Sequence, residues 1–386
     1  MSEAELNRGQ KLRDIKRFNA KKYKELEQRL RHRSSPSEWE AVMKDSENVL
    51  EIDGLKVHFY TDIGTVKAVD GASISIPRGK SVGIVGESGC GKTVTSLSIM
   101  RLLQEPQGQI AGGAIRFNPG SGPAVDLSKL PQEKMERIRG GDITMIFQEP
   151  MTTLNPVLTI GKQLDEAVKF HSQKNSNGSR RIAARSVEML KAVGIANAEG
   201  VYRMHPHELS GGMRQRVVIA MALMCDPKLI IADEPTTALD VTIQAQILDL
   251  LRSIKSKTDA SIMLITHDLG VVSEMADIVL VMYAGRVVEQ GPVREIFHNP
   301  CHPYTIGLML SRPGVKSSGK RLYSIPGNVP NPVELPDYCF FRSRCDSSIR
   351  SCAGAYPPMA RIDASGHCAA CYRHVNDAGG ASHGKK

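Results

Sequence analysis

Residues 86–93, with the sequence GESGCGKT, constrain this chain more than any other segment. They match the pattern of a phosphate-binding loop, because they follow a predicted strand at Ser81–Val85 and open a predicted helix. In such a loop, glycines let backbone N–H groups point at phosphate oxygens, and the helix start adds a favourable dipole. A chance glycine-rich turn is the alternative interpretation. The expected phosphate and magnesium contacts are Gly86, Ser88, Gly89, Cys90, Gly91, Lys92 and Thr93.

A second signal lies far along the chain and argues against a chance turn. The apolar run 229–232 ends in two carboxylates, Asp233 and Glu234. We expect Asp233 to hold Mg²⁺ together with the Thr93 hydroxyl, and Glu234 to orient and polarise an attacking water. Lys92 would reach the β- and γ-phosphates. A solvated strand end is the ordinary interpretation of two such acids, but their position favours catalysis.

The positive charge of the chain is concentrated at one end. The formal net charge is +9, and residues 1–33 hold eleven basic and five acidic side chains. The rest of the chain therefore carries only +3, which argues against a nucleic-acid binder. No apolar run reaches the roughly 18 residues that span a bilayer, and no secretory signal is visible, so we expect a cytoplasmic protein.

The order of predicted elements indicates an α/β fold. Predicted strands at Leu229–Asp233, Ser261–Thr266 and Asp277–Tyr283 alternate with helices, which predicts a mostly parallel sheet covered on both faces. Earlier strands are expected at Leu50–Thr61 and Ala72–Ile76. Helices are expected over 1–32 and through most of 159–208, with a polar break at 172–179. Residues 118–131 are rich in Gly, Pro and Ser and predict a surface loop, and residues 376–386 predict a disordered tail.

The segment Leu209–Arg216, with the sequence LSGGMRQR, stands between the two phosphate motifs. With it, the chain resembles the ATP-binding cassette (ABC) ATPases, in which Gln148, Asp240 and His267 complete the motif set in family order. The resemblance implies a P-loop NTPase fold with a RecA-like parallel core, an antiparallel β subdomain and a helical subdomain at about 150–210. It also implies three units: a basic helical extension with a linker at 1–48, the ATPase domain at 49–310, and a C-terminal extension at 311–386.

The same resemblance implies a mechanism that needs two cassettes. Each ATP would lie between the P-loop of one cassette and the segment Ser210, Gly211 and Gly212 of the other. Glu234, His267 and Gln148 would be catalytic, with Gln148 also sensing Mg²⁺, and Asp240 would link the two sites. An aromatic residue near the start of the cassette usually stacks on adenine, and either Phe59 or Tyr60 could do so.

Two later features resemble the peptide and nickel importers within that family. One is residues 298–305, with the sequence HNPCHPYT. The other is a cysteine-rich C-terminal extension, where related ATPases imply a [4Fe–4S] cluster and where zinc is the rival. The expected ligands are Cys339, Cys345, Cys352 and Cys371, with Cys368 as an alternative.

The resemblance also implies partners. We expect a heterodimer with a second ABC ATPase subunit, two membrane permease subunits and an extracytoplasmic solute-binding protein, with this chain peripheral on the cytoplasmic face of the membrane. The expected function is ATP hydrolysis coupled to uptake of oligopeptides or dipeptides. Alternatives are import of nickel or another small solute and, less in keeping with the motifs, a soluble non-transport ABC ATPase. The basic arm could lie on anionic lipid, dock on the membrane subunits, or be a solvated helix.

Overall fold

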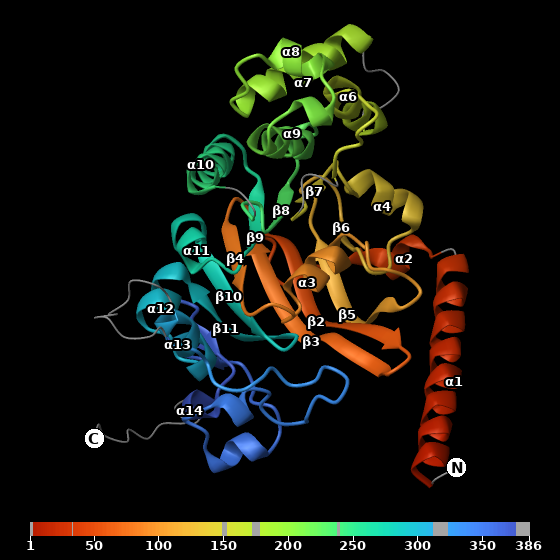
Figure 1. Ribbon diagram of the computed structural model, residues 1–386, viewed down its shortest axis with the longest axis vertical. Coiled ribbons are helices and arrows are strands. Elements are labelled where there is room, and N and C mark those ends of the chain that lie inside the picture. The colour runs from red at the N-terminus through yellow and green to blue at the C-terminus, as the bar shows by residue number, and fades with distance from the viewer. Residues whose placement is uncertain are drawn as a thin grey trace.

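The computed structural model describes residues 3–32, 34–148, 153–171, 178–237, 240–311 and 323–375. Two sheets lie at its centre, a group of helices stands above them, and the C-terminal segment lies below (Figure 1). The long N-terminal helix α1 (Glu3–Arg31) runs along one side. Among the described residues, no helix has the length and apolar character needed to cross a membrane.

The larger sheet has eight strands in the order β12-β13-β11-β10-β4-β9-β8-β7. Its strands from β10 to β7 are parallel, and the other three extend one edge in antiparallel pairing. Strands β4, β8 and β9 are buried at every residue, as expected for continuous apolar runs in a parallel sheet covered on both faces. The strands are β4 (Ser81–Val85), β7 (Ile143–Ile146), β8 (Leu229–Asp233), β9 (Ser261–Ile265), β10 (Ile278–Tyr283), β11 (Arg286–Pro292), β12 (Ala360–Arg361) and β13 (Cys368–Ala369).

The smaller sheet is antiparallel throughout, in the order β1-β6-β5-β2-β3. Buried and exposed residues alternate along the second half of β3, so that Ala72, Ile74 and Ile76 all face inward. This sheet contains β1 (Glu40–Ala41), β2 (Asn48–Thr61), β3 (Gly64–Pro77), β5 (Gly108–Phe117) and β6 (Ala124–Asp126).

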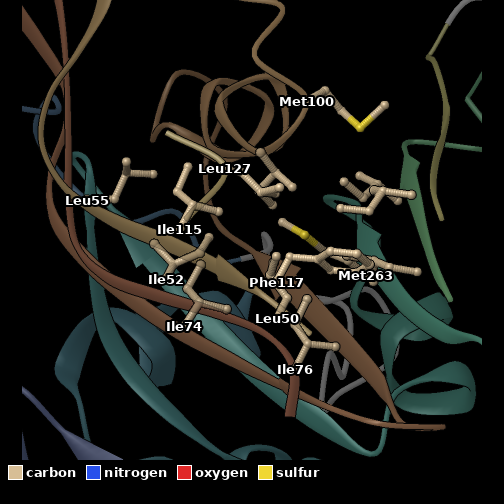
Figure 2. Packing of buried hydrophobic residues seen from close by; sticks show 14 of the residues in the cluster. Leu50, Ile52, Leu55, Ile74, Ile76, Met100, Ile115, Phe117, Leu127 and Met263 are labelled. Atoms are coloured by element: carbon tan, nitrogen blue, oxygen red, sulfur yellow. The ribbon is translucent and has the colours of Figure 1, made fainter. Parts of the chain in front are cut away.

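One apolar core joins the two sheets. Leu50, Ile74 and Phe117 from the antiparallel sheet cluster with Met263 of β9 and with Met100 at the end of helix α3 (Figure 2). The same cluster includes Val82 and Ile84 of β4. Val85 of the same strand lies in a second buried cluster with Val272, so the strand that leads into the phosphate-binding loop is packed on both faces, which sets the position of the loop.

The predicted surface loop at residues 118–131 is wrong in its second half. Residues Ala124–Asp126 form β6, and Leu127 and Leu130 are buried. The carboxylate of Asp126 accepts hydrogen bonds from the Ile115 and Ser128 backbone N–H groups, which ties this segment to β5. The Gly, Pro and Ser content describes only the turn that precedes the strand.

Helices α6 to α9 form the upper layer of Figure 1. In that layer, α6 to α9 share a buried cluster with Ile146, Ile230 and Ile262 of the parallel sheet. Most of the predicted polar break at 172–179 lies outside the described residues, which resume at Gly178. The remaining helices are α2 (Pro36–Trp39), α3 (Lys92–Ile99), α4 (Gln132–Ile138), α6 (Ile160–His171), α7 (Ser179–Ala192), α8 (Ala198–Arg203), α9 (Gly211–Leu223), α10 (Val241–Lys257), α11 (Leu269–Met275), α12 (Val293–His298), α13 (Pro303–Leu310) and α14 (Tyr372–Val375), with 3₁₀ turns η1 (Pro206–Glu208), η2 (Arg342–Arg344) and η3 (Arg350–Ala353).

The N-terminal helix α1 packs on strand β2 along one face, although most of its described side chains are exposed to solvent as in the predicted solvated helix. Asn19 Nδ2 donates to the Thr61 carbonyl at 3.0 Å, and the Tyr23 hydroxyl donates to the Tyr60 carbonyl at 2.8 Å. The Phe18 ring lies 5.9 Å from the Tyr60 ring in an edge-on arrangement. These contacts hold α1 against the antiparallel sheet.

The C-terminal extension is built onto the edge of the larger sheet. Strand β13 pairs with β11, so that Ala369 lies opposite Glu289. A buried cluster joins Phe340 and Phe341 of the extension to Tyr283 of β10 and to Tyr304 of α13. The predicted disordered tail at 376–386 lies outside the described residues.

Candidate active site

The phosphate-binding loop connects the buried end of β4 to the first turn of α3. Gly86, Gly89 and Gly91 all have positive φ, at 154°, 77° and 100°. A Cβ atom at Gly86 would lie 2.2 Å from the Met282 carbonyl oxygen, and one at Gly91 would lie 2.6 Å from the Ala68 carbonyl oxygen. Glycine is therefore required at both positions by the neighbouring backbone.

The Lys92 side chain is folded into this loop. Its Nζ donates to the carbonyl oxygens of Gly86 at 2.8 Å and Glu87 at 3.1 Å, and the residue is only 7% exposed. Cys90 packs beneath it, where burial raises the pKa of its thiol. In contrast, a Cβ at Gly89 would meet no atom within 4 Å, so the loop leaves open space at this position. A backbone nest with a fixed ammonium group suits a polyphosphate.

Thr93 and Asp233 bring two oxygen donors together beside the loop. The Thr93 hydroxyl donates to the Asp233 carboxylate at 3.3 Å, and Asp233 is 2% exposed. Burial raises the pKa of Asp233 to about 6, although the hydrogen bond from Thr93 opposes this shift. A bound cation would favour the ionised carboxylate, and hydroxyl and carboxylate oxygens are the ligands that Mg²⁺ prefers. The residues present therefore fit a magnesium ion.

Gln148, Glu234 and His267 meet at one point. Each of them follows one of the adjacent parallel strands β7, β8 and β9, so the sheet places the three side chains at the same edge. Gln148 Nε2 donates to Glu234 Oε2 at 2.9 Å, and His267 Nδ1 lies 3.1 Å from Glu234 Oε1. Thr237, which sequence analysis did not identify, donates its hydroxyl to Glu234 Oε2 at 2.8 Å.

The protonation of Glu234 follows from these contacts. Burial alone raises the pKa of its carboxyl, but the hydrogen bonds from His267 and Thr237 outweigh burial and hold this pKa below its usual value. Glu234 therefore remains an ionised hydrogen-bond acceptor near neutral pH. Its φ of 47° is unusual for a residue other than glycine, and strain of this kind often accompanies a functional site.

The Ser210–Gly212 segment is at the start of the 13-residue helix α9. Ser210 and Gly211 are exposed, and the Ser210 hydroxyl accepts a hydrogen bond from the Met213 N–H at 3.3 Å. Farther along this helix, the buried Gln215 donates to the Pro235 carbonyl at 2.7 Å. The segment is thus exposed on the surface but connected to the loop that follows Glu234.

Asp240 caps a helix next to this segment. Its carboxylate accepts a hydrogen bond from the Ile243 N–H at 2.9 Å, at the start of α10. A Cβ atom at Gly212 would lie 3.2 Å from the Ile243 side chain, so the starts of α9 and α10 are close together. Residues 238 and 239, which precede Asp240, lie outside the described residues.

The two aromatic candidates for stacking on adenine differ in accessibility. Tyr60 is 4% exposed and lies beneath Phe18 of α1. Phe59 is half-buried and packs against the core cluster that contains residues of α3, the helix that begins at the phosphate-binding loop. Successive residues of a strand point to opposite faces, so the two rings lie on opposite sides of β2, and Phe59 is the more accessible of the two.

The iron–sulfur prediction is corrected. Four of the predicted ligands line one cavity, so the structure brings these thiols near one another. A tetrahedral zinc site would require its ligand atoms to lie close together. Among the described residues, the groups with three or more ligand atoms within 4.8 Å of one another include none of the four predicted cysteines. The relatives described below carry the names of transport ATP-binding proteins. Neither a cluster nor zinc is supported at Cys339, Cys345, Cys352 and Cys371, and Cys368 does not line the cavity.

Comparison with known proteins adds independent evidence. Residues 69–237 match the family model described as ABC transporter, and residues 288–352 match the one described as oligopeptide/dipeptide transporter, C-terminal region. The oligopeptide transport ATP-binding protein AppD of Bacillus subtilis is 46% identical over 329 residues, which cover 85% of this chain and 98% of AppD. The dipeptide transport ATP-binding protein DppD of the same organism is 48% identical over 326 residues, covering 84% and 95%.

Solved structures agree on the fold. The structure of cbiO1 from Clostridium perfringens, part of the ABC transporter complex cbiONQ, matches with a TM-score of 0.54 and 28% identity. The match covers 66% of this chain and 92% of cbiO1. A dimeric ATP-binding cassette bound to ADP and phosphate matches with a TM-score of 0.56 at 24% identity, over 64% of this chain and 99% of that cassette.

Proposed function

Because this chain belongs to the ATP-binding proteins of the ABC oligopeptide and dipeptide transporters, we propose that it hydrolyses ATP to drive peptide import. One observation at the candidate active site supports this proposal most strongly. Gln148, Thr237 and His267 converge on the ionised Glu234, next to the Thr93–Asp233 pair and the phosphate-binding loop.

The chemistry assigned to these residues is water attack on the γ-phosphorus. Glu234 orients the water and accepts its proton as the water oxygen bonds to the γ-phosphorus, while His267 and Gln148 hold the Glu234 carboxylate in place. The bond from the γ-phosphorus to its bridging oxygen breaks, its electron pair stays on the β-phosphate of ADP, and ADP and inorganic phosphate are the products. Mg²⁺, held by Thr93 and Asp233 with Gln148 nearby, would neutralise the phosphate charge.

The complete site requires a second cassette. The exposed Ser210–Gly212 segment offers backbone N–H groups at a helix start, which suits the γ-phosphate of a nucleotide bound to another subunit. We propose a heterodimer with a second ABC ATPase, in which Asp240 links the two sites. Native mass spectrometry of the co-expressed pair tests this point: a mixed dimer is expected, and exclusive homodimers would contradict it.

The remaining assembly follows from the names of the relatives, which are oligopeptide and dipeptide transport proteins. We propose two permease subunits and an extracytoplasmic solute-binding protein as partners, with this chain peripheral on the cytoplasmic face of the membrane. In the proposed division of the chain, residues 49–310 perform the ATPase reaction, residues 1–48 precede it and residues 311–386 follow it.

Substitution of the proposed base tests the function in the assembled transporter. Glu234→Gln keeps the size of the side chain but removes its charge, so we expect turnover to fall by about 10²–10⁴-fold while ATP stays bound. Glu274→Gln is the matched control, because Glu274 is an exposed partner of Arg252 on the surface. Wild-type turnover in Glu234→Gln would refute the assigned role.

A further inference from the structure

Glu87 is the second residue of the phosphate-binding loop, and all three of its polar groups have protein partners. Its carbonyl oxygen accepts the hydrogen bond from Lys92 Nζ at 3.1 Å. Its backbone N–H donates to the Tyr304 hydroxyl at 2.8 Å. Its carboxylate accepts two parallel hydrogen bonds from Arg344, at 2.9 and 3.0 Å. Through its carboxylate, Glu87 therefore connects the loop to the C-terminal extension.

Each guanidinium nitrogen of Arg344 has a hydrogen-bond partner. Its side chain is only 5% exposed, although it comes from η2 in the extension, 257 residues away from Glu87 in the sequence. Its Nε donates to the Pro326 carbonyl at 2.8 Å, and a terminal nitrogen lies 3.3 Å from the Tyr283 hydroxyl. A two-pronged Arg–carboxylate pair fixes orientation as well as distance, which a single charge contact does not.

Tyr304 of α13 also holds Glu87, through the backbone N–H of that residue. It is fully buried, and its ring lies 4.7 Å from the Tyr283 ring and 5.5 Å from the Phe341 ring. Its hydroxyl accepts the Glu87 N–H, so this N–H points toward α13 and not into the phosphate nest. The backbone of Glu87 is consequently held at its N–H and at its side chain, which sets the direction of its carbonyl.

We propose that Arg344 is a positioning residue for nucleotide binding, which acts through Glu87 on Lys92. The Glu87 carbonyl is one of two acceptors that hold the Lys92 ammonium group at the loop. Without Arg344, the half-buried Glu87 carboxylate loses its partner and turns toward water, and the carbonyl that holds Lys92 moves with it. The C-terminal extension thus completes the ATP site of its own chain. This inference rests on the proposed function of the loop as an ATP site.

The test measures the affinity of the full-length chain for Mg-ATP by calorimetry. We expect Arg344→Met to raise the dissociation constant about tenfold or more, and Arg344→Lys to recover part of the loss, because hydrogen bonds to charged groups contribute on this scale. Arg342→Met is the control, because Arg342 is exposed on the same 3₁₀ turn. In the assembled transporter, the KM for ATP should rise while kcat at saturating ATP stays within about twofold.

A double-mutant cycle separates positioning from general loss of structure. If Arg344 acts through Glu87, Arg344→Met combined with Glu87→Gln should bind ATP no more weakly than either single variant does. Should Arg344→Met fail to fold, Glu87→Gln alone is expected to show the weaker binding. A folded Arg344→Met variant, or Glu87→Gln, with an affinity within twofold of the wild type would overturn the proposal. Absence of ATP binding by the wild-type chain would overturn the proposed function as well.

Discussion

Glu289 of β11 provides a quantitative test of how the C-terminal extension is attached. Its side chain is fully buried, and Oε1 accepts hydrogen bonds from the Cys301 N–H at 2.7 Å and from His367 Nε2 at 2.8 Å. Oε2 accepts the His302 N–H at 2.9 Å. One carboxylate thus connects the larger sheet to the segment before α13 and to the loop before β13.

Replacing Glu289 by alanine removes the acceptor for three donors at once. An orphaned buried donor costs about 1–3 kcal/mol, and breaking a buried ion pair by removing one partner costs about 3–5 kcal/mol. We therefore expect Glu289→Ala to destabilise the protein by about 3–5 kcal/mol. With a urea dependence near 3 kcal/mol per molar, this lowers the unfolding midpoint by roughly 1 M or more.

The assay is urea unfolding of the full chain, followed by circular dichroism. The control is Glu274→Ala, which removes an exposed ion pair with Arg252 and should cost at most about 1 kcal/mol. If both variants shifted the midpoint equally, Glu289 would not be the connection that its contacts indicate.

Three further predictions concern protonation and nucleotide contacts. Burial raises the pKa of Glu289, but hydrogen bonds from His367 and two backbone N–H groups outweigh it and hold this pKa below its usual value. Its stabilising contribution is therefore present above about pH 4.5 and lost as the pH falls through the lowered value, so Glu289→Gln should flatten the acid side of a stability–pH curve measured by thermal unfolding. Thr237→Val removes a hydrogen-bond donor to Glu234 and therefore raises the pKa of that carboxyl. The acid limb of the turnover–pH profile should then shift to higher pH, and an unchanged limb would argue against Glu234 as the base. Phe59→Ala should weaken ATP binding about tenfold through lost stacking, while Tyr60→Leu should lower the unfolding midpoint and leave the affinity unchanged; the reverse pattern would assign Tyr60 to adenine.

The buried strands of the catalytic sheet could be predicted from the sequence because local pattern determines them. The predicted strands Ser81–Val85 and Leu229–Asp233 have the same bounds as β4 and β8. Both are short apolar runs bounded by glycine or carboxylates. Strand β6 was not predicted, since its pairing with β5 outweighs the local turn composition.

The polar residues near the strand ends could be identified from the sequence, but most of their hydrogen-bond partners could not be predicted from it. The motifs identified Gln148, Glu234 and His267, and the parallel order of β7, β8 and β9 explains why they meet. Nothing local marks Arg344 as the partner of Glu87, because the pairing depends on how the extension folds back over the sheet.

The cysteine spacing predicted which residues lie near one another but not whether they bind a metal. The sequence correctly indicated that Cys339, Cys345, Cys352 and Cys371 are close together, since they line one cavity. Proximity alone did not establish a bound group. The names of the relatives, which are those of transport ATP-binding proteins, do not support the predicted cluster.

The most direct test of the account is the structure of the assembled Glu234→Gln transporter with trapped ATP, determined by electron cryomicroscopy. The account predicts that the phosphates lie against Lys92 and Thr93 of this chain, while a serine–glycine segment at a helix start of the partner ATPase contacts the γ-phosphate. A nucleotide that met both Lys92 and Ser210 of the same chain, or that lay away from Lys92, would contradict it.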